Sequence, residues 1–460
     1  MNGELSSADL LYELPARSLR SKDDRLLPRS RDSDEMGAPR MTHSTTTPVA
    51  LAMWDFSWLE RRWPGAGYED WEQALDELTD RGYDTVRIDA YPHLVAAGPY
   101  REWELVPVWN QQMWGAPAPV RVRVLPALIA FLTAARRHGV AVILSSWFRE
   151  DVEDTRMRIR SPQDLAGIWV ETLRHLDQAG LLETVLFVDL CNEFPLDIWA
   201  PFLYYDPSIR RIAPGEPGRR YAARSTPEVA AWMRSAIDGV RTVHPDLHLT
   251  FSVSTELATW PEQDVGFLDV LEVHVWMANS ELGDYDRRVG YHQPRFSDEG
   301  YRRLARHGRE EYERDRRRHD EALFTMIDTM IDTMIDTVID TMADWSRAVR
   351  KPLYTSECWS LVDYKDWPGL EWDWILDLNA RAVEYAAGTG RWAGMATSNF
   401  CGPQFVGMWR EVEWHRRLTR AITSATLDAD LADTVPSRDV GGETVAARAD
   451  GHVRGSGLRV

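Results

Sequence analysis

The sequence predicts an α/β protein built as a single (β/α)8 barrel with unstructured tails at both ends. Eight short apolar runs alternate with amphipathic segments between residues 48 and 424. The runs are apolar almost throughout, as expected for parallel strands that are buried on both faces. An open dinucleotide-binding sheet would show Gly-x-Gly-x-x-Gly after its first strand, and no such turn is present there. A closed barrel therefore fits better than an open sheet.

The predicted strands follow one another along the chain at 49–56, 84–92, 140–148, 184–194, 247–255, 270–277, 351–360 and 392–400. The predicted helices between them cover 68–82, 125–139, 161–180, 226–243, 371–388 and 411–426. A further long helical stretch precedes strand seven, and only a short linker separates strands five and six. Eight strand–helix units describe a closed barrel, whereas fewer would favour an open, doubly wound sheet.

Three segments stand outside this alternation. Residues 1–47 are polar and aperiodic, and residues 425–460 are rich in Ala, Gly, Asp and Arg, so both are predicted to be disordered tails. A Thr-Met-Ile-Asp repeat fills residues 325–344. A four-residue period drifts by about 40° per unit on an α-helix, so the Met and Ile side chains spiral around it. We interpret the repeat as an extension of the helix before strand seven; a Met-rich partner surface is the alternative.

Composition and charge exclude several classes of function. The chain has 460 residues and a formal net charge of −19, which argues against nucleic acid and anionic membranes as partners. No run of about 18 apolar residues could span a bilayer, and no signal-peptide core appears near the N-terminus, so a cytoplasmic location is expected. The three cysteines form no Cys-x-x-Cys pair and His-Glu-x-x-His is absent, so neither a metal nor a cofactor is predicted. The oligomeric state stays open.

Polar residues at the carboxyl ends of the strands mark the expected active site of such a barrel. Reading the strand ends gives Trp54, Asp55, Arg87, Asp89, Trp147, Asn192, Glu193, His274, Trp276, Glu357 and Asn399. Glu193 ends strand four and Glu357 ends strand seven. Strands three apart in a ring of eight have ends that face each other across the mouth. Two carboxyl groups about 5–5.5 Å apart are the geometry of retaining glycoside hydrolysis, so this pair is the predicted catalytic centre.

The two carboxyl groups need opposite protonation states. One must donate a proton to the leaving oxygen while the other, ionised, attacks the anomeric carbon. We expect burial beside an opposing carboxylate to raise the pKa of the acid, and Arg87 to keep the nucleophile ionised. The alternative for either glutamate alone is a structural salt bridge. A buried core histidine is likewise the alternative for His274.

Tryptophan is unusually abundant, with 21 residues. Eight fall in segments that are predicted to be loops, namely Trp103, Trp109, Trp114, Trp147, Trp260, Trp276, Trp359 and Trp409. Indole faces stack on pyranose rings, so these side chains suit a carbohydrate cleft, with a core position as the alternative. Trp54 either stacks on sugar or plugs the barrel. Asp55 and Asp89 either bind sugar hydroxyls or pair with arginine at the barrel mouth.

The same residues resemble a known family. Asn-Glu after strand four, Glu after strand seven, Thr-Val-Arg-Ile in strand two and Val-His-Val-Trp in strand six are similar to the cellulase-like glycoside hydrolases of the (β/α)8-barrel clan, over about residues 48–424. The resemblance implies that Glu193 is the acid/base and Glu357 the nucleophile. It also implies that Asn192 binds the sugar 2-hydroxyl, Arg87 supports the nucleophile and His274 belongs to the substrate subsite.

The sequence departs from this pattern in three places, which argues against cellulose as the substrate. Trp276 stands where the family has tyrosine, Ser-Ser-Trp-Phe ends strand three where histidine is usual, and Asn399 or Phe400 replaces a stacking tryptophan after strand eight. We predict a retaining β-glycosidase that acts on small or imported glycosides and oligosaccharides. The long loop at residues 93–123 would favour exo-action. The alternatives are a non-catalytic sugar-binding barrel and a transglycosylase that uses the same carboxylate pair.

Overall fold

Eight parallel strands form one sheet in the order β11–β8–β7–β2–β1–β16–β14–β12. The computed structural model describes residues 47–53, 55–111, 114–205, 209, 211–212, 220–276, 285–291, 294, 297–314, 338–361, 364–399 and 401–436. The strands of the sheet are β1 Val49–Leu51, β2 Thr85–Asp89, β7 Ala141–Ser145, β8 Val185–Asp189, β11 Leu249–Thr250, β12 Leu271–Glu272, β14 Leu353–Thr355 and β16 Trp392–Ala396. Each one falls within a predicted apolar run. The predicted fold class is confirmed.

The sheet closes into a barrel between β11 and β12. A parallel bridge joins Val253 to Val273. The backbone N–H of Val253 donates to the carbonyl of Glu272 at 3.0 Å, and that of His274 donates to the carbonyl of Val253 at 2.8 Å. Beyond the bridge, β13 (Val275–Trp276) and β15 (Cys358–Trp359) pair in parallel and extend strands six and seven. The chain from Glu272 to Trp276 therefore lies at the closing seam of the ring.

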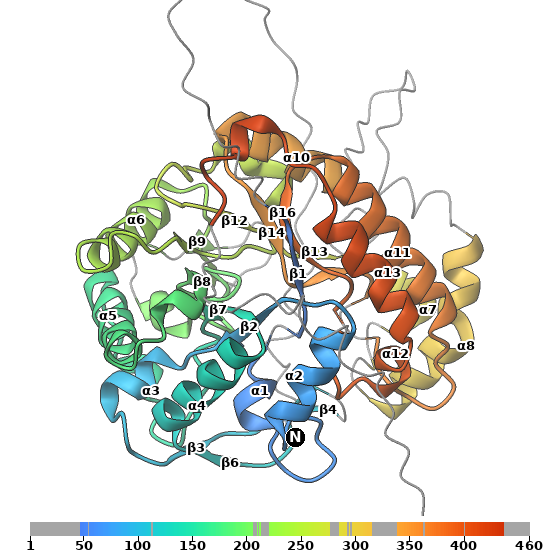
Figure 1. Cartoon of the computed structure of the whole chain (residues 1–460), viewed down its shortest axis with the longest axis horizontal. Helices are drawn as coiled ribbons and strands as arrows, with labels where there is room; N and C mark the ends of the chain where they lie inside the picture. Colours follow the sequence, from blue (N-terminus) through green and yellow to red (C-terminus); the bar gives the residue numbers. More distant parts are fainter. Residues whose placement is uncertain are drawn as a thin grey trace, which may run out of the picture.

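Helices surround the strands (Figure 1). They are α1 Ser57–Glu60, α2 Trp71–Asp80, α3 Pro92–Ala97, α4 Val124–Arg137, α5 Pro162–Gln178, α6 Pro227–Arg241, α7 Tyr285–Val289, α8 Asp298–Arg314, α10 Val338–Val349, α11 Asp373–Gly388, α12 Val406–Trp409 and α13 Val412–Thr423. Local sequence signals set several helix starts. The Asp70 carboxylate caps α2, and Ser161 caps α5 with Pro162 in its first turn. These starts let each helix turn one apolar stripe toward the strands.

Short antiparallel ribbons elaborate the loops on the barrel. In the connection from β2 to α4, β3 (Trp103–Leu105) pairs with β6 (Val120–Val122), and β4 (Val108–Gln111) pairs with β5 (Trp114–Ala116). The buried Arg61 side chain donates to the carbonyl of Gly115 at 2.8 Å, which ties this loop to the end of α1. A third ribbon pairs β9 (Arg211–Ile212) with β10 (Arg220–Tyr221). The influence of the first loop on exo-action stays a prediction.

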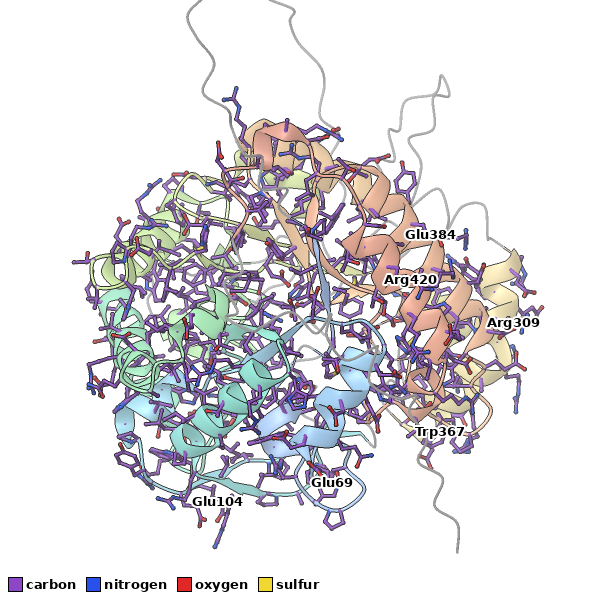
Figure 2. The ribbon with its side chains drawn as sticks, viewed as in Figure 1. Glu69, Glu104, Arg309, Trp367, Glu384 and Arg420 are labelled. Carbon is purple, nitrogen blue, oxygen red and sulfur yellow. The ribbon has the colours of Figure 1, made fainter. Side chains whose placement is uncertain are left out.

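Charged side chains lie on the outer elements. Figure 2 labels Glu69, Arg309, Glu384 and Arg420 among these residues, and all four are exposed. Arg309 on α8 forms ion pairs with Glu371 and Asp373 at 2.8 Å each, which link α8 to the start of α11. Across the described ranges, no helix has both the length and the apolar character that crossing a bilayer requires. Most of the Thr-Met-Ile-Asp repeat lies outside the described residues, and its last residues belong to α10.

The folded part extends beyond the predicted boundary at residue 424. A 3-10 turn at Ala429–Leu431 follows α13, and the Leu431 side chain is fully buried. Asp430 accepts a hydrogen bond at 2.6 Å from Arg391, whose side chain is itself buried at the start of β16. The predicted tail therefore begins too early. The polar composition of this segment gave no sign that Leu431 packs in the core or that Asp430 pairs with Arg391. Residues 1–46 and 437–460 lie outside the described part of the chain.

We expect Leu431→Ala to lower the free energy of unfolding by about 2–4 kcal/mol, because removing a buried leucine side chain leaves a cavity. Denaturant unfolding measures this change. Val406→Ala is the control: its side chain is 62% exposed, and its effect should stay within about 0.5 kcal/mol. Equal stability of the two variants would show that residues 425–436 do not pack on the barrel.

Candidate active site

The site is organised around the Arg87 guanidinium. Arg87 lies on β2 and is fully buried. Its Nη2 donates to Asp189 Oδ2 at 2.5 Å and to Asn192 Oδ1 at 2.7 Å, and its Nη1 donates to Glu357 Oε1 at 3.1 Å. Asp189 ends β8, and Glu357 lies between β14 and β15. One buried cation thus joins the carboxyl ends of strands two, four and seven.

Glu193 is held in place from several sides. Its backbone is left-handed, with φ of 45°, a conformation that costs a non-glycine residue about 1–3 kcal/mol. The Glu193 N–H donates to Ser252 Oγ at 2.8 Å, which fixes this turn. The carboxylate accepts from Trp199 Nε1 at 3.0 Å and bonds to His274 Nδ1 at 2.9 Å. The side chain therefore points across the barrel mouth in one defined orientation.

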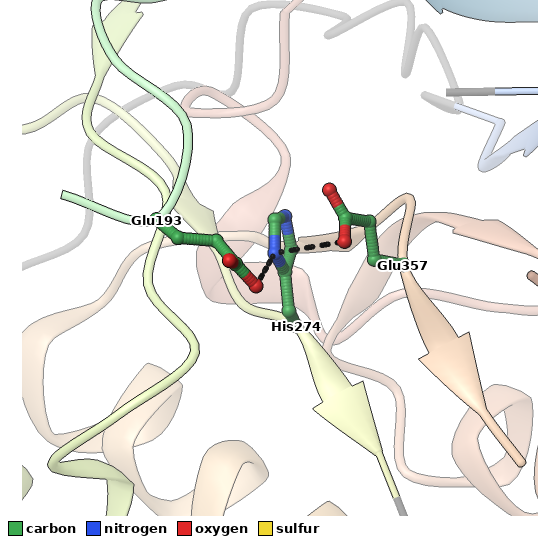
Figure 3. A group of neighbouring side chains, drawn as sticks. All are labelled: Glu193, His274 and Glu357. Carbon is green, nitrogen blue, oxygen red and sulfur yellow. Dashed lines mark hydrogen bonds and ion pairs between the residues drawn. The ribbon is translucent and has the colours of Figure 1, made fainter. Parts of the chain in front are cut away.

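His274 lies between the two glutamates (Figure 3). Its Nδ1 is 2.9 Å from Glu193 Oε1 and 3.6 Å from Glu357 Oε2. One oxygen of each carboxylate and a ring nitrogen of His274 lie within 4.8 Å of one another. All three residues are buried. The ends of strands four and seven thus bring their carboxylates to one point, with the histidine of strand six between them.

Burial and charge set the protonation of this cluster. Burial, reinforced by the negative charge of Glu193, raises the pKa of Glu357 to about 8, against the opposing charges of His274 and Arg87. Burial also acts to raise the pKa of Glu193, but the hydrogen bond and the charge of His274 outweigh it and lower that pKa. These directions are the reverse of those expected from the sequence. The reason is that His274 contacts Glu193 more closely than Glu357.

Glu193, His274 and Glu357 also have the composition of a cation site. Arg87 already places a fixed positive charge 3.1 Å from Glu357 Oε1, and this charge would repel a divalent ion. We therefore interpret the three residues as a hydrogen-bonded acid–base cluster.

Two of the predicted aspartates organise loops. Asp89 accepts backbone N–H bonds from Tyr91 at 2.7 Å and from Trp147 at 3.0 Å, one on each carboxylate oxygen. Burial raises the pKa of Asp89 to about 7. Asp55 accepts from the Ser57 N–H at 2.7 Å at the start of α1. These contacts shape the barrel mouth, and contact of either aspartate with sugar stays a prediction.

Three of the predicted loop tryptophans are buried. Trp103, Trp147 and Trp359 are at most 1% exposed, which agrees with the core alternative; contact of Trp147 with sugar stays a prediction. Trp147 packs its ring against the Arg87 guanidinium, with 4.5 Å between the guanidinium carbon and the ring centroid. Apolar loop residues that fold back onto a barrel cannot be told from cleft residues by their position in the sequence.

The other predicted sugar contacts stay predictions. Trp276 and Asn399 are buried at the ends of strands six and eight. Trp409 is buried beside Arg81, and Trp260 packs near Trp345. Trp54, Phe400 and the side chains of Trp109 and Trp114 lie outside the described residues.

Three residues of the site are missing from the sequence prediction. Asp189 precedes Asn192 in the same apolar run, and Glu272 precedes His274 by two positions on the same strand. Residues two apart on a strand share a face, so this periodicity could have identified Glu272. Trp199 comes from the loop after strand four, and no sequence signal connects its indole N–H to Glu193.

We expect Arg87→Gln to lower the free energy of unfolding by about 3–5 kcal/mol, because the Asp189 carboxylate would remain buried without its cation. Denaturant unfolding at neutral pH measures the loss. Arg101→Gln is the matched control, since its ion pair with Glu153 is exposed and should contribute less than about 1 kcal/mol. A loss for Arg87→Gln no larger than that of the control would contradict the organising role of this guanidinium.

Comparison with known proteins places the chain. The model of the family described as sugar-binding cellulase-like matches residues 51–423. The structure of a candidate glycoside hydrolase from Parabacteroides distasonis ATCC 8503 is 43% identical, covers 85% of this chain and 100% of its own, and has a TM-score of 0.77. A glycoside hydrolase family 5 mannosidase from Rhizomucor miehei is 10% identical over 82% of this chain and 94% of its own, with a TM-score of 0.42.

Among curated proteins, none matches this chain. The family match covers the barrel from the last residue of β1 to the end of α13 and includes every residue of the acid–base cluster. The chain therefore belongs to the sugar-binding, cellulase-like family.

Proposed function

We propose that the protein is a retaining β-glycosidase that hydrolyses O-glycosidic bonds of small glycosides and oligosaccharides by double displacement. The observation that carries this proposal is the approach of Glu193 and Glu357, whose carboxylate oxygens come within 4.8 Å of each other around His274. Carboxyl groups about 5–5.5 Å apart leave room for direct attack on the anomeric carbon. Inverting enzymes need about 6.5–9.5 Å to accommodate a water molecule.

In the proposed reaction, Glu193 protonates the glycosidic oxygen while a Glu357 oxygen attacks the anomeric carbon. The bond to the leaving group breaks, the alcohol departs with the proton, and a glycosyl ester forms on Glu357. Glu193, now ionised, removes a proton from an incoming water, which attacks the anomeric carbon and releases Glu357. Asn192 accepts from Arg87 through Oδ1, so its amide N–H groups are suited to donate to a sugar hydroxyl.

The proton needed for the first step is already in the cluster. The raised pKa of Glu357 favours the protonated form of this side chain, and the lowered pKa of Glu193 favours its ionised form. His274 Nδ1 faces both carboxylates. If Nδ1 gives its proton to Glu193 and takes the proton of Glu357, the imidazolium charge is unchanged and the pair reaches its reactive state. Paired titrating groups of this kind share their protons as a unit.

The 43% identical structure, which is described as a candidate glycoside hydrolase, supports the proposed class of reaction. The family description, sugar-binding, favours a second function: a barrel that binds carbohydrate without cleaving it. A transglycosylase that uses the same carboxylates is a variant of the first proposal. Four buried carboxylates around two basic groups suit catalysis better than binding alone. A carboxyl group whose pKa lies close to neutral pH, as that of Glu357 does, can exchange a proton during a reaction, whereas sugar binding does not require this.

Aryl β-glycosides test the catalytic pair. Glu193→Ala should lose about 10²–10⁴-fold in kcat for poor leaving groups, since only general acid–base catalysis is removed. Glu357→Ala should lose more, and azide should restore turnover to it with an inverted glycosyl azide as the product. Glu384→Ala is the control, because Glu384 is exposed on α11, and it should match the wild type. A wild type that binds sugar but cleaves none of a broad glycoside panel would establish the binding function instead.

We expect the first product sugar to have the β configuration, because two inversions at the anomeric carbon give net retention. Proton NMR of a fresh reaction distinguishes this from the α anomer before mutarotation. Appearance of the α anomer first would refute the double displacement. Transfer to an added sugar acceptor in preference to water would identify a transglycosylase that uses the same steps.

A further inference from the structure

Glu272 is a fully buried carboxylate that the proposed reaction does not use. It ends β12, two residues before His274. Alternate residues of a strand project to the same side, so Glu272 and His274 lie on one face of the closing seam. An ionised carboxylate is costly to bury without partners, and the partners of Glu272 are therefore informative.

The two oxygens of Glu272 have different surroundings. Oε1 accepts hydrogen bonds from the Ser356 N–H at 2.9 Å and from Ser356 Oγ at 2.5 Å. The same oxygen is 3.6 Å from His274 Nε2. Among the described residues, neither His274 Nε2 nor Glu272 Oε2 has a hydrogen-bond partner at normal distance. The ring nitrogen that faces away from the catalytic pair thus faces Glu272.

The charges that face His274 come from the ends of strands four, six and seven. Glu193 and Glu357 face its Nδ1, and Glu272 faces its Nε2. The other cation, Arg87, is already bonded to Asp189 at 2.5 Å and to Glu357 at 3.1 Å. Neither Glu193 nor Glu272 is among these ion-pair partners of Arg87. Each of them instead lies within 3.6 Å of a ring nitrogen of His274.

We propose that Glu272 is a positioning residue, whose carboxylate keeps His274 charged and oriented so that Nδ1 is presented to Glu193 and Glu357. The proposal deepens the proposed glycosidase function and rests on it for its catalytic meaning. Glu272 touches no reacting atom and acts through the imidazolium alone. Ser356 fixes the Glu272 carboxylate by two hydrogen bonds. Glu272 Oε1 therefore stays 3.6 Å from His274 Nε2, where its charge can stabilise the imidazolium.

The direction of the pKa shifts agrees with this arrangement. Burial alone would lower the pKa of His274, but the charge of Glu357 and the contacts with Glu193 and Glu272 raise it to about 10. For Glu272 the directions are opposite: burial alone would raise its pKa, but the contact with His274 and the charge of Arg87 lower it. Removing one anion from this group makes the imidazolium proton easier to lose, so His274 should then become neutral at lower pH.

Glu272→Gln in the full chain tests the proposal, because glutamine can still accept from Ser356 but carries no charge. Histidine ¹⁵N NMR, with the His274 signals assigned by difference against His274→Asn, follows the protonation of the ring directly. We expect both ring nitrogens to stay protonated through pH 8 in the wild type. In Glu272→Gln the titration should move down by about one pH unit or more, and Glu272→Asp, which keeps the charge, should restore most of it.

Kinetics provide the second readout. The alkaline limb of kcat/KM should move to lower pH in Glu272→Gln, because the cluster loses a proton that the reaction needs. Glu384→Gln is the matched control: it removes one carboxylate charge at an exposed position on α11, so its alkaline limb should remain in place. An unchanged limb and an unchanged His274 titration in Glu272→Gln would overturn the proposal.

The two proposals fail separately. If the wild type cleaves no glycoside, the glycosidase proposal fails while the NMR titration still decides the role of Glu272. If the wild type is active but His274 loses its proton near its ordinary pKa of about 6.5, Glu272 does not hold the ring charged. That last measurement does not need Glu272→Gln, so it remains decisive even if this variant does not fold.

Discussion

This site depends on the hydrogen bonds and ion pairs of the buried Arg87 guanidinium. A guanidinium can donate in several directions within one plane, and Arg87 uses this to reach Asp189, Asn192 and Glu357 from a single position on strand two. These partners end strands four and seven, which lie on opposite sides of the ring. Because the Arg87 guanidinium is buried, protein groups take the place of water around it. Its hydrogen bonds therefore link the ends of strands four and seven. The aromatic face of Trp147 packs on it and keeps water away.

The reactivity of the cluster follows from a mismatch of charges. Four carboxyl groups, those of Asp189, Glu193, Glu272 and Glu357, surround only two basic side chains, Arg87 and His274. Full ionisation would bury an excess of negative charge, which the low polarity of the interior opposes. One carboxyl group therefore keeps its proton at a pH where a free glutamic acid would have lost it, and the raised pKa of Glu357 expresses this. In a purely structural ion-pair network, equal numbers of acidic and basic groups would be more stable, because every buried charge would then be paired.

The closing seam of the barrel and the candidate site are the same part of the molecule. The bridge between Val253 and Val273 joins strands five and six, and its backbone hydrogen bonds involve the carbonyl of Glu272 and the N–H of His274. Barrel closure thus holds the backbone of both residues through hydrogen bonds that do not involve their side chains. The left-handed turn at Glu193 is held from the same side, through Ser252, which follows strand five. The contacts that close the ring therefore also position the acid–base cluster.

The sequence by itself determined the eight strands, their order and the residues at their carboxyl ends, because burial on both faces leaves a nearly continuous apolar run that polar residues terminate. It therefore indicated Glu193, Glu357, His274 and Arg87 as one group. It could not show that His274 lies closer to Glu193 than to Glu357, nor which glutamate keeps the proton. Both depend on the distances between side chains of separate strands, which are 2.9 Å to Glu193 and 3.6 Å to Glu357. The burial of Trp103, Trp147 and Trp359, the packing of Leu431 and the contact of Trp199 with Glu193 were also decided by the tertiary structure. Loops and turns carry no periodicity, so only their folded positions reveal what they touch.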